Sequence, residues 1–360
     1  MKILHVETGM HLYGGAQQVA YLLDGLARRE IDSVLVCPPG AAIGQHFSGR
    51  ARVKVLETPC SGDLDVGFIG RLTRVLRSER PDLVHLHSRR GADVLGALAA
   101  RRAGLPCVLS RRVDNPESRL WVKLKYRLHD RVVGISEGIV EVLRAEGVPE
   151  SKLRVVRSAV EADPWQHPEP RAALCAEFGV RHERLLIGVV AQLIERKGHR
   201  VLLEALRDLP QRSRLDVLFF GQGPRRETLE REIREWGLAD VVRFAGFRKD
   251  LPRWMGGLDL LIHPAYLEGL GVSLLQAAAA GVPIIASRAG GMPEAVRDGI
   301  NGMLVPPGDV AGLRAALQRL IDDPALRAQL AAGGPRLIAA EFSPETMVDG
   351  NLRVYRELLG

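Results

Sequence analysis

Residues His263 to Glu294 read HPAYLEGLGVSLLQAAAAGVPIIASRAGGMPE and indicate most clearly how the chain folds. The apolar run at residues 258–263 predicts a strand, and residues 283–287 predict a second one. Between them a glycine-rich turn leads into a helix expected over residues 273–280, with Ser273 as its N-terminal cap. A strand, a turn, a helix and a further strand in this order are typical of a parallel α/β sheet.

The turn in this stretch combines an acidic side chain with several glycines. Glu268 stands in the turn after the predicted strand and Gln276 follows eight residues later, so both side chains can face one ligand. Glycines let backbone amides approach an anion closely, which predicts an anion-binding cradle with one carboxylate at its edge. A capped core helix with a solvent-facing Glu268 is the alternative, but it gives no reason for the glycines. These are Gly269, Gly271, Gly290 and Gly291.

The same alternation of short apolar runs and helix-length segments fills the rest of the chain. In the first half it predicts strands at residues 2–6, 33–37, 83–87, 107–111, 131–135 and 153–157, and helices at 16–29, 70–79, 93–103 and 137–146. In the second half it predicts strands at 185–191, 215–220, 241–244, 258–263, 283–287 and 303–305, and helices at 200–208, 225–236, 273–280 and 310–321. The expected fold class is α/β, with two Rossmann-like domains that face each other across a cleft.

A proline-rich segment separates the two halves. Residues 162–170 read ADPWQHPEP and hold three prolines within seven residues, which predicts a stiff connector. We therefore expect an N-terminal domain over residues 1–165 and a C-terminal domain over residues 166–345, followed by residues 346–360.

Composition and charge narrow the class of protein. Of 360 residues, 46% are hydrophobic, which suffices for a core in each half and excludes a disordered chain. No apolar run approaches the ~18 residues needed to cross a bilayer, and the first residues show no secretory leader, so we expect a cytoplasmic protein. Four scattered cysteines indicate reduced thiols. A net charge of +7 favours an anionic partner, although only 5% aromatic residues and no known module argue against nucleic acid.

Two further glycine pairs follow predicted strands. Gly14 and Gly15 precede the first helix, where backbone amides and the helix N-terminus can hold a phosphate; an ordinary tight turn is the alternative. Gly221-Gln222-Gly223-Pro224 imitates a dinucleotide fingerprint, but Arg226 or Glu227 stands where its third glycine belongs. This second loop is interpreted as turn chemistry, so a dehydrogenase is a distant alternative.

Three landmarks together resemble a known family. The stretch at 263–294 and its continuation GVPIIASRAGGMPEAVRDGINGMLVPPGD, residues 281–309, are similar to the E-x7-E signature region of retaining glycosyltransferases of family 4, which have the GT-B fold. The Gly14-Gly15 turn and the segment QLIERKG, residues 192–198, match the family's other two landmarks. The resemblance covers nearly the whole chain. It implies that residues 346–360 form a helix that crosses back to the N-terminal domain.

The resemblance also implies roles for single residues. Glu268 resembles the first signature glutamate, which contacts hydroxyls of the donor sugar, and Lys197 resembles the lysine that neutralises the donor diphosphate. Two positions depart from the family: Gln192 replaces an arginine on the diphosphate, and Gln276 replaces the second glutamate, which binds the ribose hydroxyls. Because one cation and one anion are lost together, we expect altered donor contacts in an active enzyme. Arg196 can take the place of the missing cation.

The donor-binding set that the resemblance implies lies mostly in the second half of the chain. It comprises Gly14, Gly15, Gln192, Arg196, Lys197, Phe247, Glu268, Gly269, Leu270, Gly271, Val272, Ser273 and Gln276. A lysine and backbone amides can compensate the charge of the diphosphate. We therefore expect that no metal ion or other cofactor is required, the nucleotide-sugar being a substrate.

Arg112 completes the candidate catalytic set with Glu268 and Lys197. It follows the strand expected at residues 107–111, at a position where many relatives carry a histidine near the reacting sugar. Arg111 or Arg112 can stabilise charge on the leaving diphosphate or hold an anionic acceptor, because a guanidinium offers five planar donors. A solvated charge run is the alternative.

His85 and His87 form a second cluster with Arg89 and Arg90 at the end of a predicted strand. Strand alternation places the two histidines on one face of the sheet. Packed histidines are the default interpretation, and contact with the acceptor is the alternative. A metal site would need a third ligand that the sequence does not identify, so we expect no metal there.

Residues 119–129, RLWVKLKYRLH, carry basic and aromatic side chains at helical spacing. Such a helix can rest on an anionic membrane, with lysine and arginine at the lipid headgroups and the aromatic rings in the interface. It can equally pack through Leu120, Leu124 and Leu128 and leave a wet basic face. Both interpretations stay open at this point.

The resemblance implies a retaining transfer of a sugar from a nucleotide-sugar to a glycan or lipid-linked acceptor, which can be phosphorylated. A UDP-sugar is favoured as donor over a GDP-sugar, and bacterial cell-envelope polysaccharide or lipopolysaccharide synthesis is the expected setting. The second domain would hold the donor and the first the acceptor, with a peripheral position on the inner face of the cytoplasmic membrane. The alternatives are a GT-B epimerase or phosphorylase and a non-catalytic nucleotide-sugar binder.

Overall fold

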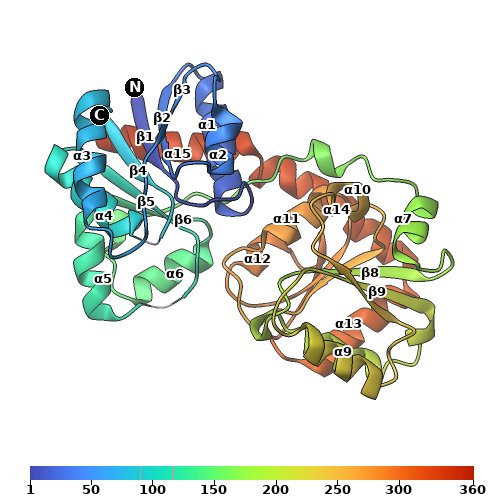
Figure 1. Ribbon diagram of the computed structural model, residues 1–360. Helices are drawn as coiled ribbons and strands as arrows, with labels where there is room; N and C mark the ends of the chain where they lie inside the picture. Colours follow the sequence, from blue (N-terminus) through green and yellow to red (C-terminus); the bar gives the residue numbers. More distant parts are fainter. Residues whose placement is uncertain (90, 116) are drawn as a thin grey trace. The chain divides into compact units, whose positions relative to one another are not determined.

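A computed structural model gives the fold and describes residues 1–89, 91–115 and 117–360. The chain divides into two compact units (Figure 1). The first comprises Met1–Ala159 and Pro344–Gly360, and the second comprises Val160–Ser343. Each unit is built on one parallel sheet with helices, as the alternation of apolar runs predicts.

The sheet of the first unit has seven strands in the order β3-β2-β1-β4-β5-β6-β7. The strands are β1 (Lys2–Val6), β2 (Asp32–Cys37), β3 (Val53–Glu57), β4 (Leu83–Leu86), β5 (Cys107–Arg111), β6 (Arg131–Gly134) and β7 (Leu153–Val155). The helices are α1 (Gly15–Arg28), α2 (Ala42–Phe47), α3 (Gly67–Glu79), α4 (Ala92–Ala103), α5 (Arg119–Lys125), α6 (Glu137–Ala145) and α15 (Pro344–Leu359). The order of the strands reverses between β1 and β4, and their carboxyl ends mark the switch point where such sheets bind ligands.

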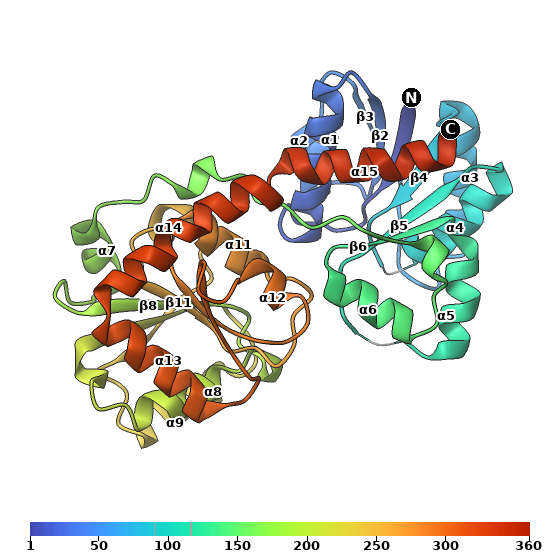
Figure 2. The ribbon, with the colours of Figure 1, turned by 180° about the vertical axis from the view of Figure 1, so that it is seen from behind.

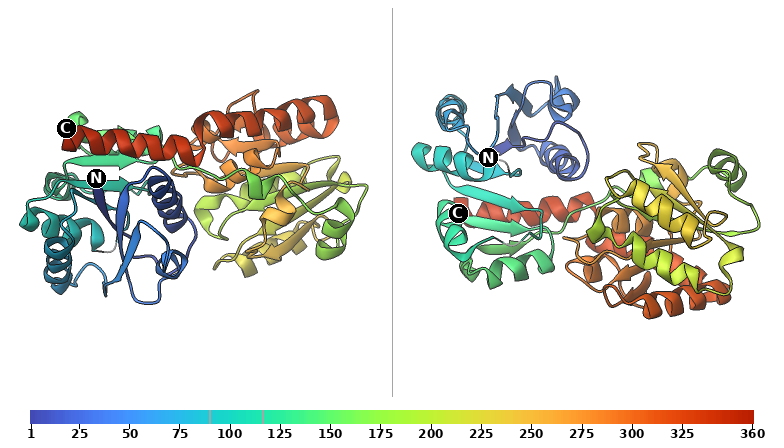
Figure 3. Two further views of the ribbon diagram at one scale, coloured as in Figure 1. Left: turned by 90° about the horizontal axis from the view of Figure 1, so that it is seen from above. Right: turned by 60° about the horizontal axis from the view of Figure 1, so that its bottom comes forward.

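Helices α4 and α15 cover opposite faces of the first sheet. Leu86 of β4 packs on α4, where a Cβ added to Gly96 would lie 2.8 Å from its side chain. The preceding residue, His85, points the other way and contacts Tyr355 of α15. Helix α15 runs along this face and shares an apolar cluster with α1 and the strands (Figure 2 and Figure 3). The last helix of the chain is therefore part of the first unit.

The sheet of the second unit has six strands in the order β10-β9-β8-β11-β12-β13. The strands are β8 (Leu185–Val190), β9 (Leu215–Phe220), β10 (Val242–Gly246), β11 (Leu260–His263), β12 (Ile284–Ser287) and β13 (Gly302–Val305). The helices are α7 (Arg171–Phe178), α8 (His199–Arg207), α9 (Arg226–Glu235), α10 (Pro252–Met255), α11 (Val272–Ala279), α12 (Met292–Ala295), α13 (Val310–Asp322) and α14 (Pro324–Glu341). Here the switch point lies between β8 and β11.

The boundaries of the units differ from the expected ones. The chain passes from the first unit to the second between Ala159 and Val160, whereas we expected this boundary after residue 165. The short 3₁₀ turn η3 (Asp163–Trp165) packs on α10 and α11, and Trp165 is only 7% exposed. Burying this large indole ties the proline-rich segment to the second unit, so it is no free spacer. The chain returns to the first unit between Ser343 and Pro344, whereas we expected this boundary after residue 345.

Candidate active site

Glu268 and Lys197 are 71 residues apart in the chain and meet at the switch point of the second sheet. Lys197 ends the 3₁₀ turn η4 (Glu195–Lys197) that follows β8, and Glu268 lies in the loop between β11 and α11. The ammonium of Lys197 contacts Oε2 of Glu268. His263, the last residue of β11, places its Nε2 3.3 Å from the same oxygen. Three titratable side chains, two from loops and one from the end of β11, therefore converge at the carboxyl ends of β8 and β11.

A glycine allows these two loops to come together. Gly198 follows Lys197 with φ +70°, and a Cβ there would lie 1.9 Å from the carbonyl oxygen of Pro264. The backbone N–H of Tyr266 donates to the carbonyl of Arg196 at 2.9 Å and joins the same loops. Any side chain at position 198 would push the Lys197 turn away from the loop that carries Glu268.

Gly290 and Gly291 support the backbone of Glu268. A Cβ on Gly290, whose φ is +55°, would lie 2.2 Å from the carbonyl oxygen of Glu268. The N–H of Gly291 donates to that oxygen at 2.9 Å. These contacts give the structural reason for the second glycine pair, which a plain capped core helix left unexplained.

The helix after Glu268 begins differently from the expectation. Gly271, with φ +86° and ψ +80°, is the N-cap of α11, and no side chain caps the helix. The prediction that Ser273 caps this helix is wrong, because the left-handed Gly271 starts the helix at Val272 and leaves Ser273 inside the first turn. In the first turn, the N–H of Leu274 donates to the carbonyl of Gly271 at 2.9 Å. The amides at a helix N-terminus carry partial positive charge.

The charges at this site are fixed by burial and by the close contacts. Burial alone would raise the pKa of the Glu268 carboxyl, but the hydrogen bond from His263 and the charge of Lys197 lower that pKa to about 2. Burial lowers the pKa of His263 more than the hydrogen bond to Glu268 raises it. At neutral pH, Glu268 is therefore an anion, and His263 is neutral and donates its Nε2–H to the carboxylate.

In the first unit, Arg112 lies at the N-terminus of α1. Gly14 is the N-cap of this helix with φ +56°, and a Cβ added to Gly15 would lie 3.2 Å from Cδ of Arg112. One guanidinium nitrogen of Arg112 lies 3.4 Å from Nδ1 of His87. Its Nε is buried and has no hydrogen-bond partner among the described residues. A guanidinium beside a helix N-terminus is a place that favours a negative group.

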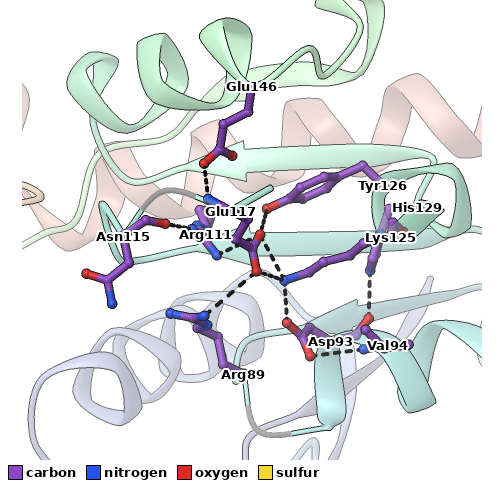
Figure 4. A network of polar contacts seen from close by, with 10 residues as sticks. All are labelled: Arg89, Asp93, Val94, Arg111, Asn115, Glu117, Lys125, Tyr126, His129 and Glu146. Atoms are coloured by element: carbon purple, nitrogen blue, oxygen red, sulfur yellow. Dashed lines mark hydrogen bonds and ion pairs between the residues drawn. The ribbon is translucent and has the colours of Figure 1, made fainter. Parts of the chain in front are cut away.

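Arg111 has different surroundings. It is 2% exposed, its guanidinium donates to the carbonyl of Asn115 at 2.5 Å, and it lies 3.3 Å from a carboxylate oxygen of Glu117. Figure 4 shows Glu117 between Arg111, Lys125 and the hydroxyl of Tyr126. A solvated charge run is therefore wrong for Arg111, because its charge is buried in this ion-pair network and holds the loop after β5.

Two family models match the chain. Residues 171–336 match "Glycosyl transferases group 1", and residues 13–159 match "Glycosyl transferase 4-like domain". Alpha-D-kanosaminyltransferase of Streptomyces kanamyceticus is 31% identical over 361 residues, which cover 89% of this chain and 92% of that protein. The chain belongs to glycosyltransferase family 4. It is therefore an enzyme of the hexosyltransferase type.

Two more comparisons extend over almost the whole glycosyltransferase. The lipopolysaccharide core biosynthesis glycosyltransferase LpsE of Rhizobium meliloti (strain 1021) is 25% identical over 360 residues, 98% of each chain. The crystal structure of Anabaena Alr3699/HepE in complex with UDP superposes with a TM-score of 0.85 at 22% identity, covering 99% of this chain and 100% of that one. The two parallel sheets thus form the GT-B fold.

The other residues of the predicted donor-binding set lie around the carboxyl ends of the second sheet's strands. Gln276 is half-buried on α11, and its side-chain amide makes no hydrogen bond to another described residue. Gln192 and Arg196 are exposed in the loop after β8, and Phe247 is exposed after β10. Leu270 is buried, so its side chain belongs to the core and only its backbone can meet a ligand. Gly269 and Gly271 are likewise buried, whereas Val272 and Ser273 are half-buried.

The glycines that imitate a dinucleotide fingerprint have a packing role. A Cβ on Gly221 would lie 1.9 Å from the carbonyl oxygen of Ala191, and one on Gly223 would lie 2.5 Å from that of Leu193. Both glycines let the loop after β9 lie against the loop after β8. The interpretation of this loop as turn chemistry therefore has a structural reason.

Helix α5 turns apolar side chains outward. Leu120 is 73%, Trp121 45% and Leu124 52% exposed. Lys125, by contrast, is 3% exposed, and its ammonium pairs with Glu117 at 3.1 Å. Packing through Leu120 and Leu124 is therefore wrong, because a buried ion pair holds the inner side of the helix. None of the helices in the described part of the chain combines the length and apolarity that crossing a bilayer requires.

The histidine cluster has a member that sequence reasoning missed. His85 and His87 are buried on the same face of the sheet, as strand alternation predicts. His5 of β1 pairs with His85 in register and is also buried. His5 lies near the end of the first predicted strand, and this position was the one indication of its role in the sequence. Its contact with His85 follows only from the strand order, which makes β1 the neighbour of β4. Arg90 lies outside the described residues.

Proposed function

We propose that this glycosyltransferase moves a hexose from a nucleotide-sugar to a glycan or lipid-linked acceptor, with retention at the anomeric carbon. The observation that carries the proposal is the meeting of Lys197, Glu268 and His263 at the switch point of the second sheet. A lysine ammonium can neutralise a diphosphate, and an ionised carboxylate can accept hydrogen bonds from sugar hydroxyls. A nucleotide-sugar carries both a diphosphate and sugar hydroxyls, so the second unit holds the donor.

A UDP-sugar is the favoured donor, and a GDP-sugar is the alternative. The complex of Anabaena Alr3699/HepE with UDP supports the uridine nucleotide. Gln276 on α11 offers a carbonyl oxygen that can accept hydrogen bonds from the ribose hydroxyls, as a carboxylate would, but without charge assistance. The missing charge weakens or alters the binding of the nucleoside. The contacts of Glu268 with the sugar remain unchanged.

The transfer needs little covalent chemistry from the protein. The bond between the anomeric carbon and the diphosphate oxygen breaks, and its electron pair leaves with the diphosphate. Lys197 and the first-turn amides of α11 offset the developing charge. The acceptor oxygen forms its bond on the same face of the sugar, and its proton passes to an oxygen of the leaving phosphate. Because these groups supply the positive charge, the proposal requires no metal ion or other cofactor.

The first unit presents the acceptor. Arg112 lies beside Gly15 at the N-terminus of α1, where it can hold a negatively charged group of the substrate. The likeness to LpsE supports a cell-envelope glycan or a lipid-linked core as acceptor. A phosphorylated acceptor suits the guanidinium, because a phosphate accepts two parallel N–H donors.

A lipid-linked acceptor calls for contact with a membrane, and α5 has the composition for it. The exposed Leu120, Trp121 and Leu124 alternate with exposed basic residues of the same segment. These are Arg119, Lys123 and Arg127. Apolar side chains enter the interface of a bilayer while basic ones meet anionic headgroups. We place the protein in the cytoplasm, peripherally on the inner face of the cytoplasmic membrane.

A binding series followed by a transfer assay tests the proposal. Thermal unfolding is recorded with UDP, GDP, ADP and their sugars; a ligand at one hundred times its Kd raises the free energy of unfolding by about 2.7 kcal/mol. The stabilising donor is then incubated with lipid-linked glycan acceptors, with and without EDTA, and the product is identified by mass spectrometry and NMR of the new linkage. We expect stabilisation by UDP or a UDP-sugar and an EDTA-resistant transfer with retained configuration.

Each other outcome names a different function. An epimer formed from the donor alone indicates an epimerase, and dependence on free phosphate indicates a phosphorylase. Saturable binding without transfer to any acceptor indicates a non-catalytic binder. Glu227→Ala, an exposed substitution on α9, is the control for unspecific effects of a changed surface charge.

A further inference from the structure

Three histidines lie beneath α15 at the carboxyl ends of β1 and β4. His5 and His87 face each other, with Nδ1 of His5 3.0 Å from Nε2 of His87. The ring of His85 lies 3.9 Å from that of His87 between centroids. Its two nitrogens lie 2.6 Å from the hydroxyl of Tyr355 and 2.9 Å from that of Ser110. All three histidines are buried.

Hydrogen bonding explains this cluster better than a metal ion. One nitrogen from each of the three histidines lies within 4.8 Å of the others, close enough for a shared metal. However, both nitrogens of His85 already have hydroxyl partners, and the nitrogens of His5 and His87 that face each other are at hydrogen-bond distance. The guanidinium of Arg112 also lies 3.4 Å from the other nitrogen of His87, where its charge would repel a cation.

The chemistry of arginine sets the direction of the hydrogen bonds. A guanidinium only donates, so Nδ1 of His87 must accept from Arg112. Burial lowers the pKa of His87 well below its ordinary value, so the ring is neutral and carries a single proton. That proton is therefore on Nε2, and it is donated to Nδ1 of His5. His5 in turn carries its own proton on Nε2.

The Arg112 side chain makes few other polar interactions with the described residues. Its Nε is buried without a hydrogen-bond partner in the described part of the chain, and a Cβ added to Gly15 would lie 3.2 Å from its Cδ. Among the described residues, His87 is the side chain that hydrogen-bonds the guanidinium, whereas Glu7 acts on it through its charge. His5 in turn fixes the tautomer of His87.

We propose that His87 is a positioning residue for Arg112: its Nδ1 lone pair aims the guanidinium at the N-terminus of α1, and the hydrogen bond to His5 keeps that lone pair available. The role of Arg112 toward substrate rests on the proposed function, whereas the hydrogen-bond chain does not. A guanidinium held in one direction meets its anionic partner without losing freedom on binding, which favours the transition state.

Two substitutions at position 87 separate this role from simple packing. In His87→Asn the amide oxygen takes the place of Nδ1 and still accepts from Arg112, but the donor to His5 is lost. In His87→Gln the amide nitrogen takes the place of Nε2 and still donates to His5, but the acceptor for Arg112 is lost. Both variants remove the buried ring, so both lose similar packing and should unfold at similar temperatures.

We expect His87→Gln to lower kcat on the order of 10- to 100-fold with a nearly unchanged KM for the donor, and His87→Asn to recover most of the loss. In an Arg112→Ala background the two variants should have equal kcat. Equal kcat of the two variants with Arg112 present, or a difference that persists without Arg112, would overturn the proposal.

A measurement without turnover keeps the two proposals apart. In protein labelled with ¹⁵N-histidine, we expect the His87 ring to show a protonated Nε2 and an unprotonated Nδ1, assigned by its disappearance in the variants. A proton on Nδ1 would overturn the positioning role and leave the transferase function intact. The expected tautomer in a protein that transfers no sugar would instead count against the proposed function alone.

Discussion

Glu268 owes its ionised state to two neighbours that come from different loops. Burial opposes the charge of this carboxylate, and the hydrogen bond from His263 and the ammonium of Lys197 outweigh burial. The sequence predicted Glu268 and Lys197 as separate contacts of one donor, and the structure shows that they contact each other. In the proposed function, donor binding replaces this ion pair by contacts to the diphosphate and to the sugar.

Replacing Glu268 tests its role at the donor sugar. We expect Glu268→Ala to lower kcat/KM by on the order of 2 to 4 kcal/mol in transition-state stabilisation, because a contact to the reacting sugar is lost. Glu268→Gln keeps a hydrogen-bond acceptor without the charge and should lose less. Steady-state kinetics with the stabilising donor measure both variants, and Glu227→Ala should match the wild type. Wild-type kinetics in Glu268→Ala would remove this residue from the site.

At the scale of elements, local pattern and tertiary packing disagree in a few places. Strand β3 at the sheet edge and helix α14 were not predicted, and α14 runs through Gly333, Gly334 and Pro335, which usually break helices. A Cβ on Gly334 would lie 2.4 Å from the carbonyl oxygen of Ala278, so the glycine allows α14 to pack closely on α11. Helix α14 packs closely although its sequence does not favour a helix. In α5, by contrast, the periodicity is that of a packed helix, but its leucines are exposed.

The outward face of α5 predicts binding to anionic vesicles. We expect the protein to float with vesicles that contain phosphatidylglycerol at low salt, and to bind less at high salt because the basic residues are screened. The double substitution Trp121→Ser and Leu124→Ser should weaken binding by roughly tenfold or more, since each large apolar side chain contributes about 1.5 to 3 kcal/mol when buried.

Leu64 provides the matched control for this prediction. It is 94% exposed and lies outside α5, so Leu64→Ser should float like the wild type. Absence of flotation at low salt would contradict a membrane contact. Equal binding of the double variant and the wild type would assign the contact to another surface.

At the scale of the whole molecule, buried neutral histidines connect stability to pH. Burial lowers the pKa of His5 to about 3 and that of His199 to about 4. Burial also lowers the pKa of His129 to about 4, although its hydrogen bonds to backbone carbonyls act the other way. Buried, neutral histidines occur in both units. Acidic pH is therefore expected to lower the free energy of unfolding of both units.

The unfolded chain binds protons at these histidines near pH 6.5, whereas the folded chain binds them only at much lower pH. Stability is therefore fully present above about pH 6.5 and is lost as the pH falls below it. Between pH 6.5 and pH 5 we expect a loss of roughly 1 to 2 kcal/mol for each such histidine. Urea unfolding midpoints at several pH values measure this loss, and His182→Gln, at an exposed position, should leave the profile unchanged. A stability that stays constant down to pH 5 would contradict the prediction.

Much of the candidate site could be predicted from the sequence. Glu268, Lys197 and Gly14-Gly15 stand in motifs with fixed spacing from a strand, so their place at a loop follows from local pattern. The role of His263 was missed although this residue begins the segment 263–294, because a strand-end side chain can face the site or the core. His5 was missed because its partners come from another strand.

The alternation of strands and helices, the two halves and the family could be recognised without a structure. They depend on apolar periodicity and on motifs whose residues lie close together in the chain. Which polar side chains meet depends on the folded structure: Lys197 contacts Glu268, Arg112 contacts His87, and Lys125 contacts Glu117. It also decided that Val160 and Trp165 belong to the second unit. The physical reason is that burial and pairing depend on which strands become neighbours, and strand order is a property of the folded sheet.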